Sequence, residues 1–195
     1  FYDGGSVMPN WCNNSITITG DIETLSQLKP VIAAGEGLLQ AIKPMPKELR
    51  ETVKGSGDEL QTEVYDGATN WYDWAVTNWG TKWDPEVHLE FEDNGDGTAT
   101  INGWFDTAWA PPIDAFQTLV DDWDSCYIEL MYEESGMCFV GCFDSEGGDD
   151  YYEYSEATSK TIKDIVPAYL VEHFALDERL DEYEQEEEQP EELAN

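Results

Sequence analysis

The sequence predicts an α+β fold of ferredoxin-like type, in which an antiparallel sheet carries helices on one face. Two strands, a helix and two further strands follow one another between Glu86 and Asp144, and a strand followed by a helix precedes them. The 195 residues are 41% hydrophobic and 13% aromatic. This composition is enough to bury one core, and disordered chains are poor in aromatic residues.

The chain opens with a predicted strand over residues 15–19, where isoleucines alternate with threonines. Asp21 is a suitable N-cap for a helix that we expect over residues 22–34. Gly35 suits the position after the last helical residue, because glycine readily adopts the left-handed conformation found there.

The next part of the chain is expected to be rich in loops. Residues 42–49 contain two prolines and should be irregular, and residues 51–69 contain three glycines and should form a surface loop. Asn70 can cap a helix with tryptophans at helical spacing, which belong to a core more often than to a ligand-stacking platform. The tryptophans that we expect to be buried are Trp71, Trp74 and Trp79.

A β-hairpin is predicted next, with strands over residues 86–92 and 98–105. Its turn, residues 93–97, contains the Asn-Gly and Asp-Gly pairs that favour tight turns. The turn resembles a calcium-binding loop only in part, because Gly103 stands where the bidentate glutamate would be needed. We therefore interpret it as a plain turn.

The second half of the domain is expected to contain two helices and three strands. Two prolines open a helix over residues 113–123. A shorter helix is predicted over residues 168–174, with Pro167 in its first turn. The strands are predicted over residues 126–133, 137–144 and, at the sheet edge, 151–154.

The chain is expected to hold one domain, residues 8–176, with a loop-rich N-terminal part. Residues 1–7 include a linker-like Asp-Gly-Gly-Ser and are interpreted as an added leader outside the fold. Residues 177–195 form an acidic tail with almost no apolar periodicity. We expect this tail to be helical or disordered and to be dispensable for folding.

Negative charge is concentrated in one patterned stretch. Residues 83–159 hold 20 Asp or Glu and no Lys or Arg, and the chain has a net charge of −34. Phosphates and anionic membrane surfaces would repel such a protein, which argues against direct binding of nucleic acid or membrane. No apolar run reaches the roughly 20 residues of a membrane span. The expected partners are cations, either metal ions or a basic protein surface.

Few residues suit catalysis or a cofactor. The four cysteines are spaced too irregularly for a disulfide framework or a zinc site, so we expect free thiols in a reducing cytoplasm. His88, between Glu86 and Glu90, could bind a metal or do acid–base work, but a single exposed histidine beside acids usually has no such role. We therefore expect no cofactor, no metal and no enzymatic activity.

Three motifs resemble one known family. They are MPNWCNN at residues 8–14, NWGTKW at residues 78–83 and FDTAWAPP at residues 105–112. Together they resemble the Api-type family of phage and plasmid proteins that carries a ferredoxin-like domain. The resemblance spans about residues 8–176 and implies a mobile-element protein of the bacterial cytoplasm. It brings no catalytic residues with it.

The acidic surface suggests a function. Carboxylates two residues apart on a strand are separated by about 6.7 Å, which is comparable with neighbouring phosphates on one nucleic-acid strand. Three aspartates at the end of the helix over residues 113–123 oppose the helix dipole, which hints at a functional surface. The candidate partner-binding residues are Glu86, Glu90, Glu92, Asp121, Asp122, Asp124, Glu129, Glu133, Glu134, Asp144, Glu146, Asp149 and Asp150.

Our leading interpretation is a DNA mimic that inhibits a host defence protein, a nuclease or restriction complex, by occupying its basic cleft. Exposed aromatics such as Trp123 or Tyr151 would stand in for bases or anchor the contact. One alternative is an acidic interaction or regulatory protein that does not imitate DNA. Another is a metal-dependent enzyme that uses clustered carboxylates.

Overall fold

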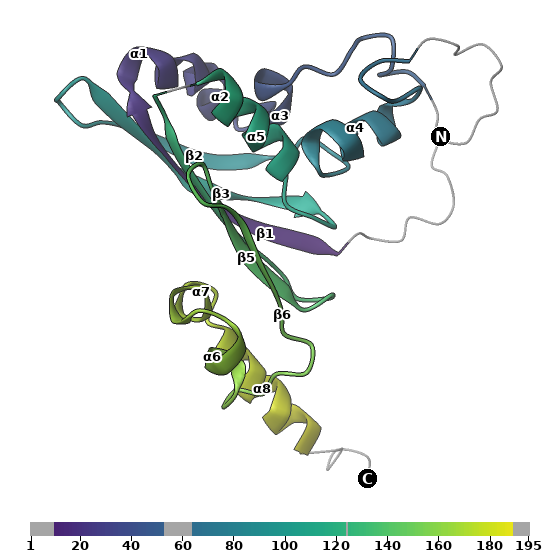
Figure 1. The fold of residues 1–195 in the computed structure, drawn as a ribbon, viewed down its shortest axis with the longest axis vertical. Helices are drawn as coiled ribbons and strands as arrows, with labels where there is room; N and C mark the ends of the chain where they lie inside the picture. Colours follow the sequence, from purple (N-terminus) through teal and green to yellow (C-terminus); the bar gives the residue numbers. More distant parts are fainter. Residues whose placement is uncertain (1–9, 53–63, 124, 189–195) are drawn as a thin grey trace.

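A six-stranded antiparallel sheet runs through the protein (Figure 1). The computed structural model describes residues 10–52, 64–123 and 125–188. Neighbouring strands follow the order β2-β3-β1-β4-β5-β6, so β2 and β6 are the sheet edges. The strands are β1 (Trp11–Asp21), β2 (Val87–Asp93), β3 (Thr98–Ala108), β4 (Tyr127–Glu134), β5 (Phe139–Asp144) and β6 (Gly148–Glu153).

The first four strands have the ferredoxin-like arrangement. Helices connect β1 to β2 and β3 to β4, and each connected pair has one antiparallel strand between its members. These are two split β-α-β units, which confirms the predicted α+β class and antiparallel sheet. Strands β5 and β6 then extend the sheet beyond β4, and both neighbouring pairs are antiparallel.

The helix predicted over residues 22–34 is divided into three short helices. They are α1 (Ile22–Leu25), a 3-10 helix (Ser26–Leu28) and α2 (Lys29–Ala34). Pro30, in the first turn of α2, explains the division. Proline has no backbone N–H to continue a helix, and its ring crowds the preceding turn.

Both predicted ends of this helical segment are confirmed. The Asp21 carboxylate accepts hydrogen bonds from the backbone N–H groups of Glu23 at 3.0 Å and Thr24 at 2.9 Å. Gly35 ends α2 with a φ of 73°, in the left-handed region.

Two other helices agree with their predicted ranges to within one residue at each end: α5 (Ile113–Asp122) and α7 (Ala168–His173). Helix α4 (Trp71–Trp79) begins directly after its predicted cap, Asn70. The sequence does not predict α3 (Leu38–Ile42) and α6 (Ile162–Ile165), which are too short for apolar periodicity to indicate them. The predicted leader, residues 1–7, and most of the predicted loop, residues 51–69, lie outside the described residues.

Two of the three tryptophans on α4 are buried as predicted. Trp74 and Trp79 pack edge to face with ring centroids 5.4 Å apart, and the Trp79 indole N–H donates to the Lys43 carbonyl at 2.9 Å. Trp71 is only half-buried at the margin of this cluster.

Helices α1 to α5 cover one face of the sheet, here called the inner face (Figure 1). Its core contains Ile16 and Ile18 of β1, Phe105 of β3, Leu130 of β4 and Phe116 of α5, all of which are buried. These strand residues alternate with outward side chains, as the period of two in a strand requires.

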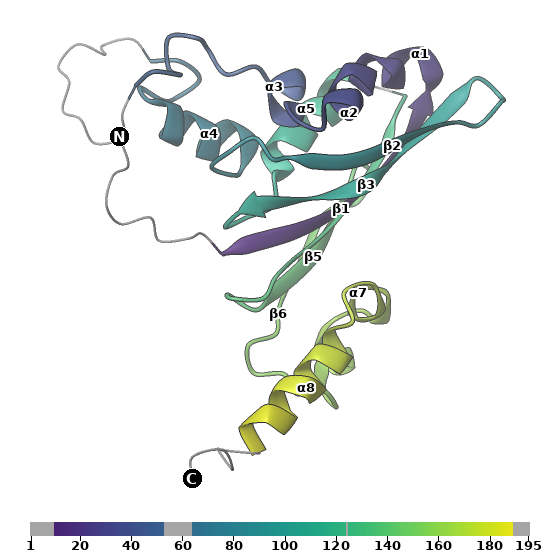
Figure 2. The ribbon, with the colours of Figure 1, turned by 180° about the vertical axis from the view of Figure 1, so that it is seen from behind.

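The outer face has a helical layer of its own, which the sequence does not predict. Helices α6, α7 and α8 (Leu176–Glu188) pack against Val140 and Cys142 of β5. Figure 2 shows these helices beside β5 and β6, away from α1 to α5. Strand β5 is buried on both faces, which explains its almost continuous apolar run, FVGCF.

Helix α8 is attached to the domain by specific contacts. Leu176 is buried, and Arg179 forms an ion pair with Glu133 of β4, with Nη1 3.2 Å from Oε2. The Glu184 carboxylate accepts hydrogen bonds from the backbone N–H of Ser159 at 2.7 Å and its hydroxyl at 3.0 Å. The expected tail is therefore helical over its described residues, and two of its side chains, Arg179 and Glu184, attach it to the domain.

Candidate binding surface and aromatic pocket

The helices leave part of the outer face uncovered. One row of outward side chains crosses the sheet from β2 to β4 in the order Glu90, Asn102, Thr17 and Glu129. Glu90 and Asn102 are exposed, and Thr17 and Glu129 are half-buried. We call this outer side of β2, β3, β1 and β4, as far as Glu129, the open face. Its centre is polar and uncharged, and a carboxylate stands at each end of the row.

Further carboxylates flank the open face on both sides. Glu92 follows Glu90 along β2, and Asp144 of β5 pairs with Glu129 of β4. Asp150 of β6 is exposed beyond them. None of the six strands contains Lys or Arg, so no cationic side chain of the sheet neutralises these carboxylates.

Several carboxylates lie near Tyr127 at one side of the open face. Burial raises the pKa of Tyr127, and the charges of Glu129, Asp144 and Glu146 raise it further. Nearby negative charges have this effect because they oppose formation of the tyrosinate anion. Three of the predicted partner-binding residues therefore act together at one place.

Other predicted residues lie elsewhere. Asp121 and Asp122 are exposed at the end of α5, which covers the inner face, and Asp124 after them lies outside the described residues. Asp149 lies on the inner side of β6, where it accepts a hydrogen bond from the Tyr132 hydroxyl at 2.6 Å. The predicted set is therefore divided between two sides of the sheet, and one flat partner cannot contact all of it.

The prediction that Glu133 contacts a partner is wrong, because this side chain is buried between β4 and α8. Its carboxylate accepts hydrogen bonds from the Tyr154 hydroxyl and from Nη2 of Arg179, the latter at 3.3 Å. Burial first, and then the bond to Glu133, raise the pKa of Tyr154, which keeps its hydroxyl a donor. Strand alternation puts Glu133 on the same face as Glu129, but it contains no information about the helix that covers this position.

Glu134 is also wrongly predicted, because it is buried at the end of β4. Its carboxylate accepts hydrogen bonds from the backbone N–H groups of Gly136 and Met137, each at 2.8 Å. The Asn10 amide donates to it at 3.4 Å. Glu134 therefore stabilises the turn between β4 and β5.

The two aromatic residues proposed as anchors differ in exposure. Trp123 is half-buried and packs against the inner core, so it is not free to contact a partner. Tyr151 on β6 is 50% exposed, and its ring centroid lies 5.4 Å from that of Phe139.

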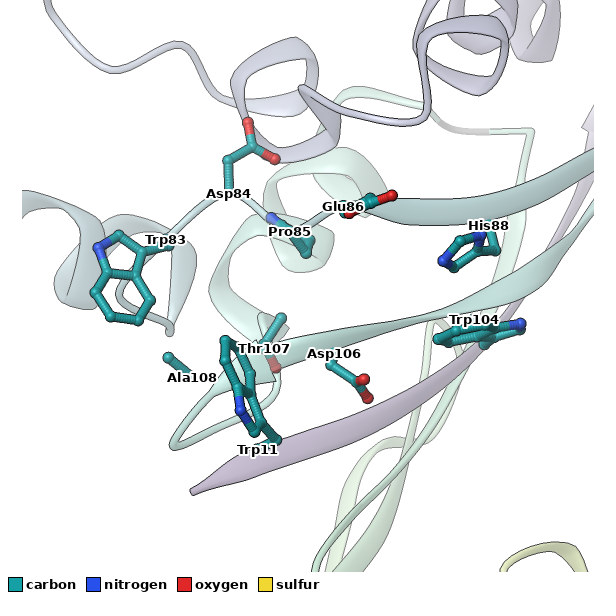
Figure 3. A pocket seen from close by; sticks show the side chains of 10 residues that line it. All are labelled: Trp11, Trp83, Asp84, Pro85, Glu86, His88, Trp104, Asp106, Thr107 and Ala108. Atoms are coloured by element: carbon teal, nitrogen blue, oxygen red, sulfur yellow. The ribbon is translucent and has the colours of Figure 1, made fainter. Parts of the chain in front are cut away.

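A pocket of about 460 Å³ lies at one end of the open face, beside the start of β1 and β2 and the end of β3 (Figure 3). Three tryptophans line it and keep 52%, 41% and 48% of their surface exposed: Trp11, Trp83 and Trp104. Glu86 and Asp106 add carboxylates. Only Glu86 of these five was a predicted site residue. The sequence signal for the pocket was Trp104, a large apolar residue on the polar side of β3.

Contacts inside the pocket fix several of its groups. The His88 and Trp104 rings stack with centroids 4.1 Å apart and planes inclined by 27°. The Asn13 amide donates to Oδ1 of Asp106 at 3.0 Å, which holds this carboxylate in place. Nζ of Lys82 lies 4.0 Å from the ring centroid of Trp83, so one indole of the pocket already contacts a cation.

The cysteines are free thiols, as expected. Burial raises the pKa of Cys142 to about 11, so this thiol stays protonated and unreactive at neutral pH. Within the described parts of the chain, no three His, Cys, Asp or Glu side chains come together in a way that could hold a metal ion. No helix among those same residues is both long enough and apolar enough to span a membrane.

Comparison with known proteins gives one family match. The family described as the ferredoxin-like domain in Api92-like protein matches residues 78–191. The chain belongs to this family. No curated protein and no solved structure was found to match the chain.

The matched Api92-like region contains most of the candidate site. It includes strands β2 to β6, Trp83 and Trp104 of the pocket, and helix α8. The match continues past residue 176, where the resemblance in the sequence was expected to end. The helical part of the acidic tail is therefore part of the family domain.

Proposed function

We propose that this protein is a non-enzymatic inhibitor that binds the basic nucleic-acid-binding surface of a partner protein through its open face. The observation that carries the proposal is a sheet without Lys or Arg, whose uncovered side is flanked by Glu90, Glu92, Glu129 and Asp144. In the bacterial cytoplasm that the family resemblance implies, the partner would be a nuclease or restriction complex of the host.

The charge distribution favours a basic partner for two physical reasons. A surface of one sign attracts a complementary surface over a distance and accelerates association, and it repels partners of like charge. A protein surface that binds DNA presents Lys and Arg to phosphates, so carboxylates spaced across a sheet can occupy the same groups. Binding of this kind is distributed over many weak contacts and weakens as salt screens them.

A competition assay tests the proposal. Affinity capture on the immobilised full chain isolates the partner, and labelled duplex DNA is then displaced from the purified partner by increasing amounts of the protein across a salt series. We expect displacement at low salt and a steep loss of affinity for both competitors as salt rises. Simultaneous binding of DNA and the protein to the partner, with unchanged DNA affinity, would leave an acidic interaction protein without DNA mimicry.

Charge reversals on the two sides of the sheet locate the binding surface. The double variant Glu90→Lys/Glu129→Lys changes the open face, and we expect it to weaken partner binding by about tenfold or more at low salt. The matched control, Asp121→Lys/Asp122→Lys, makes the same change in net charge at the end of α5. Equal loss of affinity in the two variants would mean that total charge alone determines binding and would contradict a role for the open face.

A further inference from the structure

The tryptophan pocket at the end of the open face is chemically unlike its surroundings. Trp11, Trp83 and Trp104 keep about half of their surface exposed within one pocket, although exposed indoles reduce solubility. The centre of the open face is polar, with threonine and asparagine side chains. Three exposed indole rings therefore lie together in one concave place beside the polar centre of the open face.

The groups in this pocket select for a cation. Indole rings present a negative face that attracts a cation within about 6 Å of the ring centroid, and tryptophan is the best aromatic side chain for this contact. The carboxylates of Glu86 and Asp106 add two full negative charges to the same pocket. The two carboxylates would repel an anion, and a neutral apolar group would gain nothing from them.

The structure contains an internal example of this contact. The ammonium of Lys82 lies 4.0 Å from the ring centroid of Trp83. It lies over one face of Trp83, the His88 ring stacks on Trp104, and Trp11 stands on β1. The Lys82 contact shows that a tryptophan ring of this pocket can hold a cation.

We propose that the pocket binds the guanidinium group of an arginine side chain on the protein partner. A guanidinium is planar, stacks on an indole ring, and forms paired hydrogen bonds with a carboxylate. One guanidinium can therefore contact both the indole rings and the carboxylates of the pocket. Asp106 is suited to this because Asn13 fixes its carboxylate at 3.0 Å. The inference rests on the proposed function for the identity of the partner, since arginine is abundant on surfaces that bind DNA phosphates.

The test uses small probes and the full chain, so it does not depend on the partner. Nitrogen-15-labelled protein is titrated with N-acetyl-arginine amide while the indole N–H signals of Trp11, Trp83 and Trp104 are followed by NMR. The matched probe is N-acetyl-citrulline amide, which has nearly the same shape and no charge. Tetramethylammonium chloride, at the same ionic strength, supplies a cation that cannot donate hydrogen bonds.

We expect the arginine probe to shift the pocket indoles with saturation, the citrulline probe to leave them unchanged, and tetramethylammonium to bind more weakly than arginine. The variants Asp106→Asn and Trp104→Leu should each weaken the arginine probe by roughly three- to thirtyfold. The control variant Glu23→Gln removes one exposed carboxylate from α1 and should bind the probe like the unaltered protein. Thermal unfolding of all variants establishes that they are folded.

Three results would overturn the assignment. Equal shifts with arginine and citrulline would show that charge is not recognised, and tighter binding of tetramethylammonium would show that guanidinium geometry is not used. Loss of probe affinity in Glu23→Gln to the same extent as in Asp106→Asn would also contradict a local site. If the arginine probe did not bind but the protein still competed with DNA for the partner, only the pocket assignment would be refuted. If the probe bound but the protein did not compete with DNA, only the proposed function would be refuted.

Discussion

Glu133 joins three parts of the structure through one buried carboxylate. It stands on β4 and binds the Tyr154 hydroxyl after β6 and the Arg179 guanidinium on α8. A buried donor that loses its acceptor is costly, because it has already lost its hydrogen bonds to water. We therefore expect Glu133→Ala to lower the free energy of unfolding by about 2 kcal/mol. Urea unfolding followed by circular dichroism measures the change.

The matched control for this substitution is Glu156→Ala, which removes an exposed carboxylate from the turn after Tyr154. It changes net charge by the same amount and should shift the free energy of unfolding by less than about 0.5 kcal/mol. If the two variants were equally stable, the Glu133 contacts would contribute nothing beyond relief of charge repulsion.

For single residues, the sequence predicts which face of a helix or strand a side chain occupies better than it predicts what surrounds that side chain. The period of helix α4 correctly indicates that Trp74 and Trp79 are buried, and capping chemistry correctly identifies Asp21 and Gly35. Glu133 is misassigned because strand alternation gives the face of a side chain but not what covers that face. Trp104 was missed because strand alternation gives its outward position on β3 but does not show that a pocket lies on that side.

Helix α8 illustrates how an acidic segment can still belong to a folded unit. Its apolar positions are few, but Leu176 is buried and Leu180 packs against the cluster formed by α6 and α7. A chain that ends at Ala175 should therefore lose about 3 kcal/mol of unfolding free energy, since burial of a leucine contributes about 1.5–3 kcal/mol. Denaturant unfolding of the shortened chain measures this loss.

The matching control is a chain that ends at Glu188, the last described residue of α8. It removes acidic residues without removing the leucine contacts, and it should unfold at the same denaturant concentration as the full chain. Identical midpoints for all three chains would show that α8 does not contribute to the stability of the domain.

At the scale of elements, the strands and the longer helices could be predicted because each has a repeating pattern. The division of the segment over residues 22–34 depends on Pro30, which lies near its middle and has no backbone N–H to continue a helix. The short helices α3 and α6 are below the length at which periodicity can be recognised. The helical layer on the outer face was signalled only by the FVGCF run of β5, in which both faces of a strand are apolar.

For the molecule as a whole, the net charge of −34 should make stability and binding respond to salt in opposite directions. Self-repulsion destabilises a compact chain of one sign, and salt screens it. We expect the melting temperature to rise between low salt and about 0.3 M sodium chloride, by roughly 3 °C for each kcal/mol of repulsion that is screened. Partner binding should weaken over the same range.

Scanning calorimetry and the partner-binding assay, carried out in the same buffers, measure both responses. A melting temperature that stays constant while binding weakens would mean that the carboxylates repel one another little in the folded protein. A melting temperature that falls with salt would contradict the expectation and would indicate that attractive ion pairs, such as that of Arg179 with Glu133, dominate the electrostatic stability.

The carboxylates on the edge strand β6 also affect how copies of the same chain associate with one another. An edge strand offers unpaired backbone N–H and C=O groups to which another strand can add, and charged side chains prevent this addition. The sequence of β6, GDDYYE, places Asp149, Asp150 and Glu153 along that edge. Near the isoelectric point of about 4.1, carboxylates become partly protonated and this barrier to self-association falls. The charge that we propose attracts a basic partner should therefore also oppose edge-to-edge association of copies of this chain at neutral pH.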